Sequence, residues 1–315
     1  MKPTQAQPAR WGTFTPILIL SAAFLVAPAA GRADTIYVSN SGDNTIRKFT
    51  SGGTGSVFAS AGLDAPEGLA LDSAGNLYVA NYGNSTIMKF TPGGVGSVFA
   101  NTGLLGPSTL SFDRAGNLYV ANTGSYDYGI QNYHSYIEKF TPSGVGSVFA
   151  DATARDPDGL ACDSAGNLYA AYRSNLPAIM KFTPGGTGSV FASTGTPSAQ
   201  GLAFDSAGNL YDSYGPAGTI GRFSLTGTGL GIFASGLLNP VGVAFDSAGN
   251  LYATNFTSSN GYIEKLTPGG AGSVFATGLS WPVFVAIQVP EPSTWAVLVL
   301  GLPALFACLR TRQSA

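Results

Sequence analysis

The segment spanning residues 123–135 gathers side-chain types that serve recognition or chemistry. It holds three tyrosines, an aspartate and the only histidine of the chain: Tyr126, Asp127, Tyr128, Tyr133 and His134. Tyrosine gives a large contact area at low entropic cost, so this composition is typical of adaptable ligand recognition. His134 is also the candidate for a catalytic base. We expect a ligand-binding loop here, and the alternative is a tolerated surface insertion.

A second group of acidic residues recurs regularly along the chain. The heptad Asp-x-Ala-Gly-Asn-Leu-Tyr occurs five times, beginning at Asp72, Asp113, Asp163, Asp205 and Asp246. Each aspartate stands beside an Ala-Gly-Asn turn, where its carboxylate can bond the turn amides. We therefore interpret these aspartates as structural turn caps and not as a catalytic ring of acids.

The heptads belong to a repeat of about 41 residues that contains four short strand patterns. In one repeat the expected strands are residues 68–72, 77–80, 86–90 and 97–100. Short strands separated by glycine and proline, without helical periodicity, indicate an all-β repeat. Four strands in about 40 residues make the blade of a β-propeller.

The two ends of the repeat region decide the number of blades. Residues 36–40 match the second strand of a repeat, and residues 281–288 match the first strand. Five complete repeats and one split repeat predict a six-bladed propeller over residues 34–288. In the closing blade, one strand comes from the C-terminal end and three come from the N-terminal end (1+3).

The run from Pro66 to Asn81, Pro-x-Gly-Leu-Ala-x-Asp-Ser-Ala-Gly-Asn-Leu-Tyr-Val-Ala-Asn, resembles the NHL repeat. The resemblance extends over residues 34–288 and implies a six-bladed propeller, in agreement with the blade count. The family includes protein-binding and RNA-binding modules, sensor ectodomains and a few lyase or lactonase relatives. The resemblance therefore leaves the function open.

One ring of residues is expected at the mouth of the propeller channel, just before each first strand: Glu67, Ser108, Asp158, Gln200, Val241 and Val283. Glu67 and Asp158, with Asp156 nearby, are candidate oxygen ligands for calcium. The metal-binding set of gluconolactonase-like propellers is not recognisable in this sequence. Calcium is the only cofactor that the sequence leaves open.

The loops between second and third strands differ from repeat to repeat. The asparagine that ends the second strand in four repeats is replaced by Tyr172 and Tyr214 in two others. The next position varies further and includes Tyr82, Arg173 and Phe256. We expect a rim of aromatic and amide groups that can stack on and hydrogen-bond to sugars or peptides. The alternative is neutral drift of surface loops.

Composition excludes several classes of function. Charged residues are only 10% of the 315-residue chain, with 15 basic against 17 acidic residues. Without a basic excess, electrostatic binding of nucleic acid is not expected. One histidine and two cysteines, Cys162 and Cys308, exclude a His₃ zinc site and a disulfide scaffold. Cys162 takes an apolar strand position and is expected to be a buried thiol.

The N-terminal 33 residues have the organisation of a secretory signal peptide. Lys2 and Arg10 precede an apolar run at residues 17–26, and small residues follow up to Ala33. Cleavage before Asp34 is expected, with an uncleaved membrane anchor as the alternative.

Residues 289–315 resemble the PEP-CTERM sorting signal. The motif Pro290-Glu291-Pro292 precedes an apolar run at residues 296–309 and a short basic end. The resemblance implies an exosortase partner and an exopolysaccharide-producing, Gram-negative host. A short apolar helix with terminal arginines is expected to stop in the membrane. Plain anchoring without processing is the alternative.

Together these features predict an exported propeller at the cell surface or in the extracellular matrix, held by the membrane only through its tail. We expect a binding module for a glycan, such as exopolysaccharide, or for a surface protein, rather than an enzyme. The runner-up is a calcium- or carboxylate-dependent lactonase, lyase or hydrolase that uses the same face.

Overall fold

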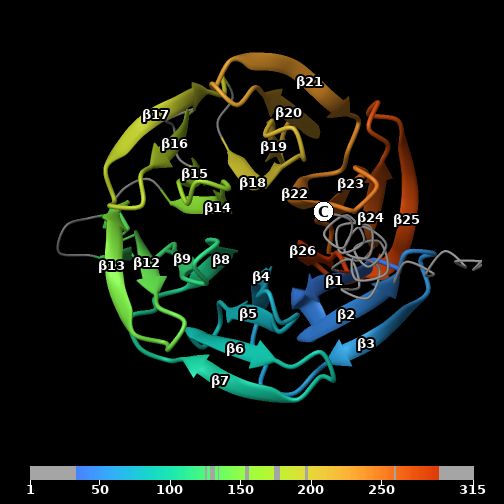
Figure 1. Ribbon diagram of the computed structural model, residues 1–315. Coiled ribbons are helices and arrows are strands. Elements are labelled where there is room, and N and C mark those ends of the chain that lie inside the picture. The colour runs from blue at the N-terminus through green and yellow to red at the C-terminus, as the bar shows by residue number, and fades with distance from the viewer. Residues whose placement is uncertain are drawn as a thin grey trace, which may run out of the picture. The chain divides into compact units, whose positions relative to one another are not determined.

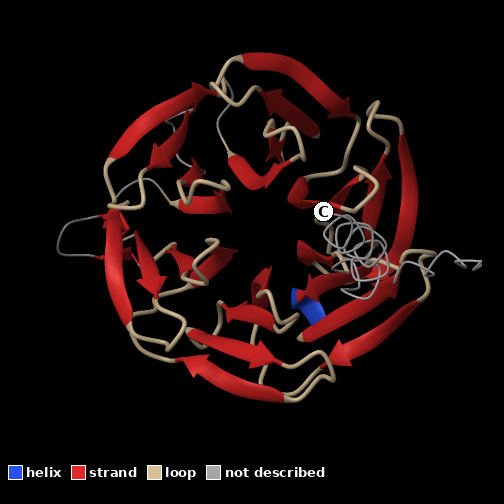
Figure 2. Cartoon of the chain, in the orientation of Figure 1, coloured by secondary structure: helices blue, strands red, loops and turns tan. Residues whose placement is uncertain are grey.

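In the computed structural model, the described residues are 33–290 without 125, 128–131, 134, 153–155, 174–177, 196–197 and 259. They form one compact unit of six four-stranded antiparallel sheets arranged in a ring (Figure 1). Beyond these strands and the small hairpin β10–β11, regular structure in the described part is one short 3₁₀ turn at Ser41–Asp43 (Figure 2). None of the helices in this part is both long and apolar enough to cross a membrane. The expected all-β six-bladed propeller is confirmed.

The blades follow one another along the chain, each with its first strand nearest the channel and its fourth outermost (Figure 1). Blade 1 contains β26 (Pro282–Gln288), β1 (Thr35–Asn40), β2 (Thr45–Thr50) and β3 (Gly55–Ala59). Blade 2 contains β4 (Pro66–Leu71), β5 (Leu77–Asn81), β6 (Thr86–Phe90) and β7 (Gly96–Ala100). Blade 3 contains β8 (Pro107–Phe112), β9 (Leu118–Asn122), β12 (Tyr136–Phe140) and β13 (Gly146–Asp151).

The other three blades repeat this plan. Blade 4 contains β14 (Pro157–Cys162), β15 (Leu168–Tyr172), β16 (Ala178–Phe182) and β17 (Gly188–Ser193). Blade 5 contains β18 (Ala199–Phe204), β19 (Leu210–Tyr214), β20 (Thr219–Phe223) and β21 (Gly229–Ser235). Blade 6 contains β22 (Pro240–Phe245), β23 (Leu251–Asn255), β24 (Gly261–Leu266) and β25 (Gly272–Leu279).

The closing blade joins the two ends of the repeat region. Strand β26 pairs antiparallel with β1 from Thr35 opposite Gln288 to Asn40 opposite Pro282. Three N-terminal strands and one C-terminal strand therefore complete the ring, as the 1+3 closure predicts. Because every blade packs on two neighbours, this closure leaves no blade with an unpacked face.

Repeated aromatic contacts hold neighbouring blades together. Tyr78 of blade 2 makes edge-to-face contacts with Phe99 of its own blade and Phe112 of blade 3, both with ring centroids 4.9 Å apart. Lys89 lies over the same tyrosine ring, 5.0 Å from its centroid, and pairs with Asp72 at 3.5 Å. Similar tyrosine–phenylalanine contacts recur within blades 3, 4 and 6 and between blades 4 and 5 and blades 5 and 6, so the consensus residues of the repeat are used for packing.

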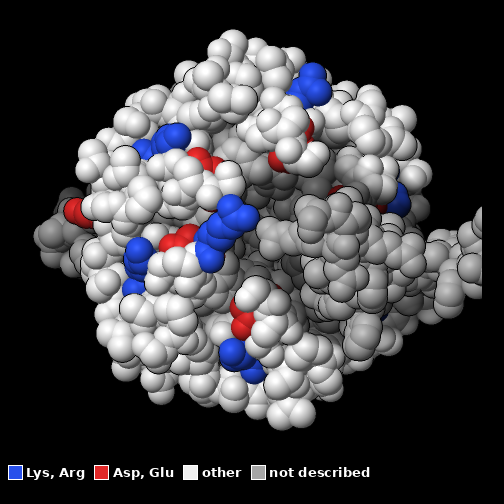
Figure 3. All heavy atoms as spheres, in the orientation of Figure 1, with Lys and Arg blue, Asp and Glu red and all other residues white. Residues whose placement is uncertain are grey.

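The five heptad aspartates each bind their own turn. In Asp163, Oδ1 accepts hydrogen bonds from the backbone N–H of Ala165 and Asn167, both at 2.9 Å, and Oδ2 accepts one from Asn167 Nδ2 at 2.8 Å. The same three bonds occur at Asp72, Asp113, Asp205 and Asp246. These carboxylates are therefore occupied by the scaffold. Figure 3 shows how sparse the charges are on one face, where most basic groups lie beside acidic ones.

First strands approach one another closely around the channel, and this requires glycine. A Cβ on Gly201 of β18 would meet the carbonyl oxygen of Val241 in β22. A Cβ on Gly159 of β14 would likewise meet the carbonyl oxygen of Gln200. Each of these glycines directly follows a channel-mouth residue, so the same short segment closes the ring and presents a side chain to the channel.

Candidate functional site: the channel mouth

A cavity of about 540 Å³ lies at one end of the channel, which is within the usual range for small-ligand sites. A second hollow of about 490 Å³ shares Glu67, Tyr82, Asp158 and Arg173 with it. All six residues predicted for the mouth line one or both: Glu67, Ser108, Asp158, Gln200, Val241 and Val283.

These six residues lie inside the first strands, not just before them as the sequence predicted. Pro66 pairs with Asn81, but the next paired residue of β4 is Leu69, opposite Val79. Glu67 therefore lies in an irregularity of the pairing, and similar register shifts occur in the other blades. The sequence pattern could not show this bulge, which changes the direction of the strand at the channel mouth.

Each blade adds a rim residue with left-handed backbone immediately before its first strand. The six are Ala65, Gly106, Asp156, Ser198, Asn239 and Trp281, with φ between 39° and 71°. In every blade except blade 5, the carbonyl of this residue accepts a hydrogen bond from the start of the loop between strands two and three of the same blade. Tyr82, Thr123, Arg173, Phe256 and Ser41 donate these bonds at 3.0–3.1 Å. In these five blades the link holds two rim positions next to one another.

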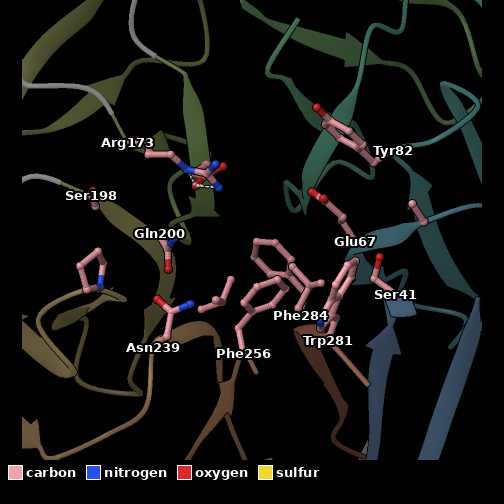
Figure 4. Close-up of a pocket in the computed structure, with 15 residues that line it drawn as sticks. Ser41, Glu67, Tyr82, Arg173, Ser198, Gln200, Asn239, Phe256, Trp281 and Phe284 are labelled. Atoms are coloured by element: carbon pink, nitrogen blue, oxygen red, sulfur yellow. Dashed lines mark hydrogen bonds and ion pairs between the residues drawn. The ribbon is translucent and has the colours of Figure 1, made fainter. Parts of the chain in front are cut away.

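The rim and mouth residues divide the cavity into two walls (Figure 4). Phe256, Trp281 and Phe284 lie together along one side, with Val241 and Val283 also lining the cavity. The rest of the lining is largely polar and includes Glu67, Asp158, Arg173, Gln200 and Asn239. An apolar aromatic surface thus faces hydrogen-bonding groups across a space open to ligands.

Asp158 and Arg173 form the strongest contact of the polar wall. Arg173 Nε and Nη2 both lie 2.6 Å from Asp158 Oδ2. Asp158 is only 5% exposed, and burial raises the pKa of its carboxyl while Arg173 opposes that shift. The two groups neutralise each other, so neither is a free acid or base.

Glu67 is a half-buried carboxyl with no hydrogen bond or ion pair to another described residue. Burial raises its pKa to about 8, the negative charge of Asp158 adds to the shift, and Arg173 opposes it. At neutral pH Glu67 is therefore mainly a neutral acid that can donate a hydrogen bond into the cavity.

The predicted site residues are distributed unevenly. Tyr82, Arg173 and Phe256 line the cavity, and Tyr82 is 43% exposed. Tyr172 and Tyr214 instead lie in the hydrophobic core between blades, so they contribute no rim surface. The asparagines at their position are also buried. In Asn81, Oδ1 accepts from Asp64 N at 3.2 Å and Nδ2 donates to Gly62 O at 2.9 Å, which fastens the loop that enters the blade.

The segment at 123–135 is an insertion between β9 and β12, as predicted. Its backbone includes a small hairpin of β10 (Tyr126–Asp127) and β11 (Asn132–Tyr133). Tyr128 and His134 lie outside the described residues, as do Glu291 and Pro292 of the tail motif and the signal segment before Ala33. Pro290 ends the described part of the chain.

No group of three or more His, Cys, Asp or Glu side chains that could hold a metal ion occurs among the described residues. Glu67 and Asp158 line the same cavity, but Asp158 is already bound to Arg173. Cys162 is half-buried, and burial raises the pKa of its thiol to about 12. It is therefore a thiol at neutral pH and unsuited to nucleophilic attack.

Sequence reasoning missed Trp281 and Asn239 as site residues. Both occupy the left-handed position before the first strand, and both line the cavity. The sequence does hold a signal for them. In most repeats a proline opens the first strand, and the residue before this proline can be compared from blade to blade.

Comparison with known proteins supports the fold and leaves the activity open. The NHL repeat model matches residues 63–90, which cover most of blade 2. No curated protein matches the chain in sequence. A chain in the crystal structure of a nidogen/laminin complex has 17% identity and a TM-score of 0.69, covering 82% of this chain and all of that one.

Two enzymes of known structure share the architecture. A gluconolactonase from Xanthomonas campestris has 22% identity and a TM-score of 0.59, over 70% of this chain and 79% of its own. A virginiamycin B lyase from Staphylococcus aureus has 14% identity and a TM-score of 0.52, over 67% of this chain and 69% of its own. At these identities the likeness shows the fold alone. The chain is therefore a six-bladed β-propeller that carries an NHL repeat.

Proposed function

We propose that this propeller is a binding module that holds a glycan or a protein segment in its channel mouth. The observation that carries the proposal is the cavity of about 540 Å³ with an aromatic wall opposite a polar wall. Aromatic faces and a few fixed polar groups are what binding pockets use for contact area and orientation.

The polar wall supports binding better than catalysis. Arg173 and Asp158 are engaged with each other, and the remaining amides, Gln200 and Asn239, are not proton-transfer groups. The aspartates that recur in the sequence are bound to their turns. Apart from Glu67, the side chains left for a ligand are hydrogen-bonding and stacking groups.

We further propose that the chain is exported and sorted. Residues 1–33 would direct export, and residues 289–315 would be recognised by exosortase through Pro290-Glu291-Pro292. The propeller would then lie at the cell surface or in the extracellular matrix, with only its tail in the membrane. Replacing Glu291 by Ala should leave the tail uncut and the protein in the membrane fraction. An unchanged distribution between membrane and medium would contradict sorting by this motif.

The binding proposal is tested with the full chain on glycan and peptide arrays. We expect specific retention by one class, and loss of at least tenfold in affinity when Arg173 and Phe256 are both replaced by Ala. Val274→Ala is the matched control, because this exposed residue lies on the outer strand β25 and does not line the cavity. Retention that survives the double substitution would place binding elsewhere.

A second function is favoured by one observation, the raised pKa of Glu67. A carboxyl that stays protonated to about pH 8 beside a fixed Asp158–Arg173 pair can serve as a proton donor. The fold is shared with a gluconolactonase and a lyase, which makes a carboxylate-dependent hydrolase, lactonase or lyase the alternative. The test is turnover of glucono-1,5-lactone at pH 6, with Glu67→Gln as the comparison. Acceleration that Glu67→Gln abolishes would establish the enzyme, and no acceleration would reject a lactonase.

A further inference from the structure

Trp281 stands out among the six left-handed rim residues. The corresponding residues in other blades are small or turn-forming: Ala65, Gly106, Asp156, Ser198 and Asn239. A bulky residue in this region is a conformational outlier, and the left-handed backbone costs roughly 1–2 kcal/mol for a residue with a Cβ. Trp281, at φ 50°, is nevertheless 46% exposed, so core packing does not explain its presence.

The backbone holds this tryptophan in place. Trp281 N donates to Thr257 O at 3.2 Å, and its carbonyl accepts from Ser41 N at 3.1 Å. The ring lies beside Phe256, with centroids 6.2 Å apart and an interplanar angle of 32°. Two aromatic rings that are only moderately tilted give a broad, fixed apolar surface at the edge of the cavity (Figure 4).

The facing wall offers unused hydrogen-bonding capacity. Gln200 is only 9% exposed, yet its Oε1 has no hydrogen-bond partner among the described residues. Arg173 Nη1 and the Glu67 carboxyl also have none within that part of the chain. Buried polar groups are normally paired, so Gln200 Oε1 lacks a hydrogen-bond donor that a ligand hydroxyl or amide group can supply.

The charged side chains that line the cavity favour an uncharged ligand over an anionic one. Among the described residues, Arg173 is the only basic one that lines either hollow, and it is already paired with Asp158. Asp156 adds a further acidic group to the same region, and Glu67 adds a carboxyl that is mainly neutral at pH 7. An anionic ligand would meet more acids than bases, whereas an uncharged ligand would meet both donors and acceptors without a charge to compensate.

We propose that the channel mouth binds a short neutral oligosaccharide, with one pyranose face stacked on Trp281 and Phe256 and its hydroxyl groups on the polar wall. A pyranose ring has an apolar C–H face and a polar edge, which matches an aromatic surface opposite amides and carboxyls. This inference rests on the proposed binding function and names the class of ligand for the same site.

Tryptophan fluorescence reports on this site directly. The chain has three tryptophans, Trp11, Trp281 and Trp295, and only Trp281 lies in the propeller. In the full chain carrying W11F and W295F, Trp281 is the sole tryptophan. Titration with neutral cello-, manno-, xylo- and malto-tetraoses should shift its emission with at least one of them. Tetragalacturonate and chitosan tetramers are the anionic and cationic probes.

Variants measured by calorimetry in the wild-type background separate stacking from folding. We expect about a tenfold loss of affinity in Trp281→Ala, because the sugar face loses the ring on which it stacks. The loss should be smaller in Trp281→Phe, which keeps an aromatic ring at this position. Leu225→Ala, an exposed residue that does not line the cavity, should bind as wild type.

The outcomes separate the ligand class from the binding function itself. Tighter binding of the anionic or cationic tetramer than of every neutral one would overturn the neutral class. Binding of a peptide from the array, with no response to any oligosaccharide, would overturn the glycan and leave the binding module intact. A chain that retains no glycan or peptide would overturn both proposals.

Discussion

The two ends of the blades differ in how they use their side chains. At the turns between first and second strands, five heptad aspartates make the same three hydrogen bonds to their own turns. At the channel mouth, the equivalent positions of the six blades hold five residue types, with valine in two blades. At the turns the repeated residues are used by the scaffold, whereas at the mouth the varying residues line the cavity.

The two ends also differ in whether their polar groups have hydrogen-bond partners. The turn carboxylates have full sets of partners, whereas Glu67 and Gln200 in the mouth have polar atoms without partners in the described structure. Scaffold substitutions should therefore lower stability, and mouth substitutions should change binding with little loss of stability. Four substitutions test this division, in order of decreasing effect.

The largest effect is expected where strands meet around the channel. Gly201→Val would place a side chain against the Val241 carbonyl, and overpacking of this kind costs about 3 kcal/mol. In a domain of this size that lowers the Tm by about 6–12 °C, measured by calorimetry. Gln200→Ala, at the adjacent mouth position, is the matched control and should change the Tm by only a few degrees. Equal changes in Tm for the two variants would contradict the division between scaffold and mouth residues.

A turn cap should show a moderate effect. Asp163→Ala removes three hydrogen bonds to the turn and should lower the free energy of unfolding by about 1–2 kcal/mol at pH 7. Burial raises the Asp163 pKa, but hydrogen bonds from Asn167, Tyr169 and Ala165 outweigh it and the pKa is lowered. The stabilisation is therefore present above the ordinary pKa of 3.8 and is lost as the pH falls further. Denaturant unfolding of the wild type and Asp163→Ala at pH 7 and pH 3 measures the difference in their free energies of unfolding. A difference at pH 3 as large as that at pH 7 would contradict an ionised cap.

Glu67 should give the opposite pH dependence. Its pKa is raised from 4.5 to about 8 by burial and by Asp158, against the charge of Arg173. Between these values the unfolded chain loses a proton that the folded chain keeps, so stability falls as the pH rises to about 8. Glu67→Gln should flatten this decline while leaving the Tm at pH 5 nearly unchanged. Identical pH profiles for the two proteins would show that Glu67 is ionised in the fold.

The smallest stability change is expected at Trp281, with an unusual sign. Trp281→Gly relieves the left-handed backbone and should raise the free energy of unfolding by up to about 1 kcal/mol. The same change removes the aromatic surface, so binding should be lost. A variant that gains stability and loses the ligand would mark a residue retained for function. Loss of stability of more than about 1 kcal/mol would instead show that the ring supports the scaffold.

The sequence was sufficient for the regular part of this molecule and insufficient for the irregular part. The Asp-x-Ala-Gly-Asn-Leu-Tyr heptads predicted the turns and the strands, because each repeat carries the same local signals, and the partial repeats at the two ends predicted the 1+3 closure. The expected strand at residues 86–90 coincides with β6 (Thr86–Phe90). The expected first strand at residues 68–72 is observed as β4 (Pro66–Leu71), which begins two residues earlier and ends one residue earlier. The bulge that follows Pro66 has no marker in the amino-acid pattern.

The site was predicted in part for the same reason. Glu67, Asp158, Arg173, Tyr82 and Phe256 were identified because they vary at repeated positions. Tyr172 and Tyr214 vary as well, yet they fill the core between blades. Variation within a repeat therefore marks a position without a shared scaffold role, and only the packed structure shows whether its side chain points into the core or into the mouth.

Hydrogen–deuterium exchange with and without the retained ligand tests the central claim most directly. The account predicts added protection in the segments 64–67, 156–158, 198–200, 239–241 and 281–284, which surround the mouth. The turns that begin at Asp72, Asp113, Asp163, Asp205 and Asp246 should exchange at unchanged rates. Protection confined to those turns, or to the outer strands, would show that the regular end of the blades holds the ligand and would contradict the account.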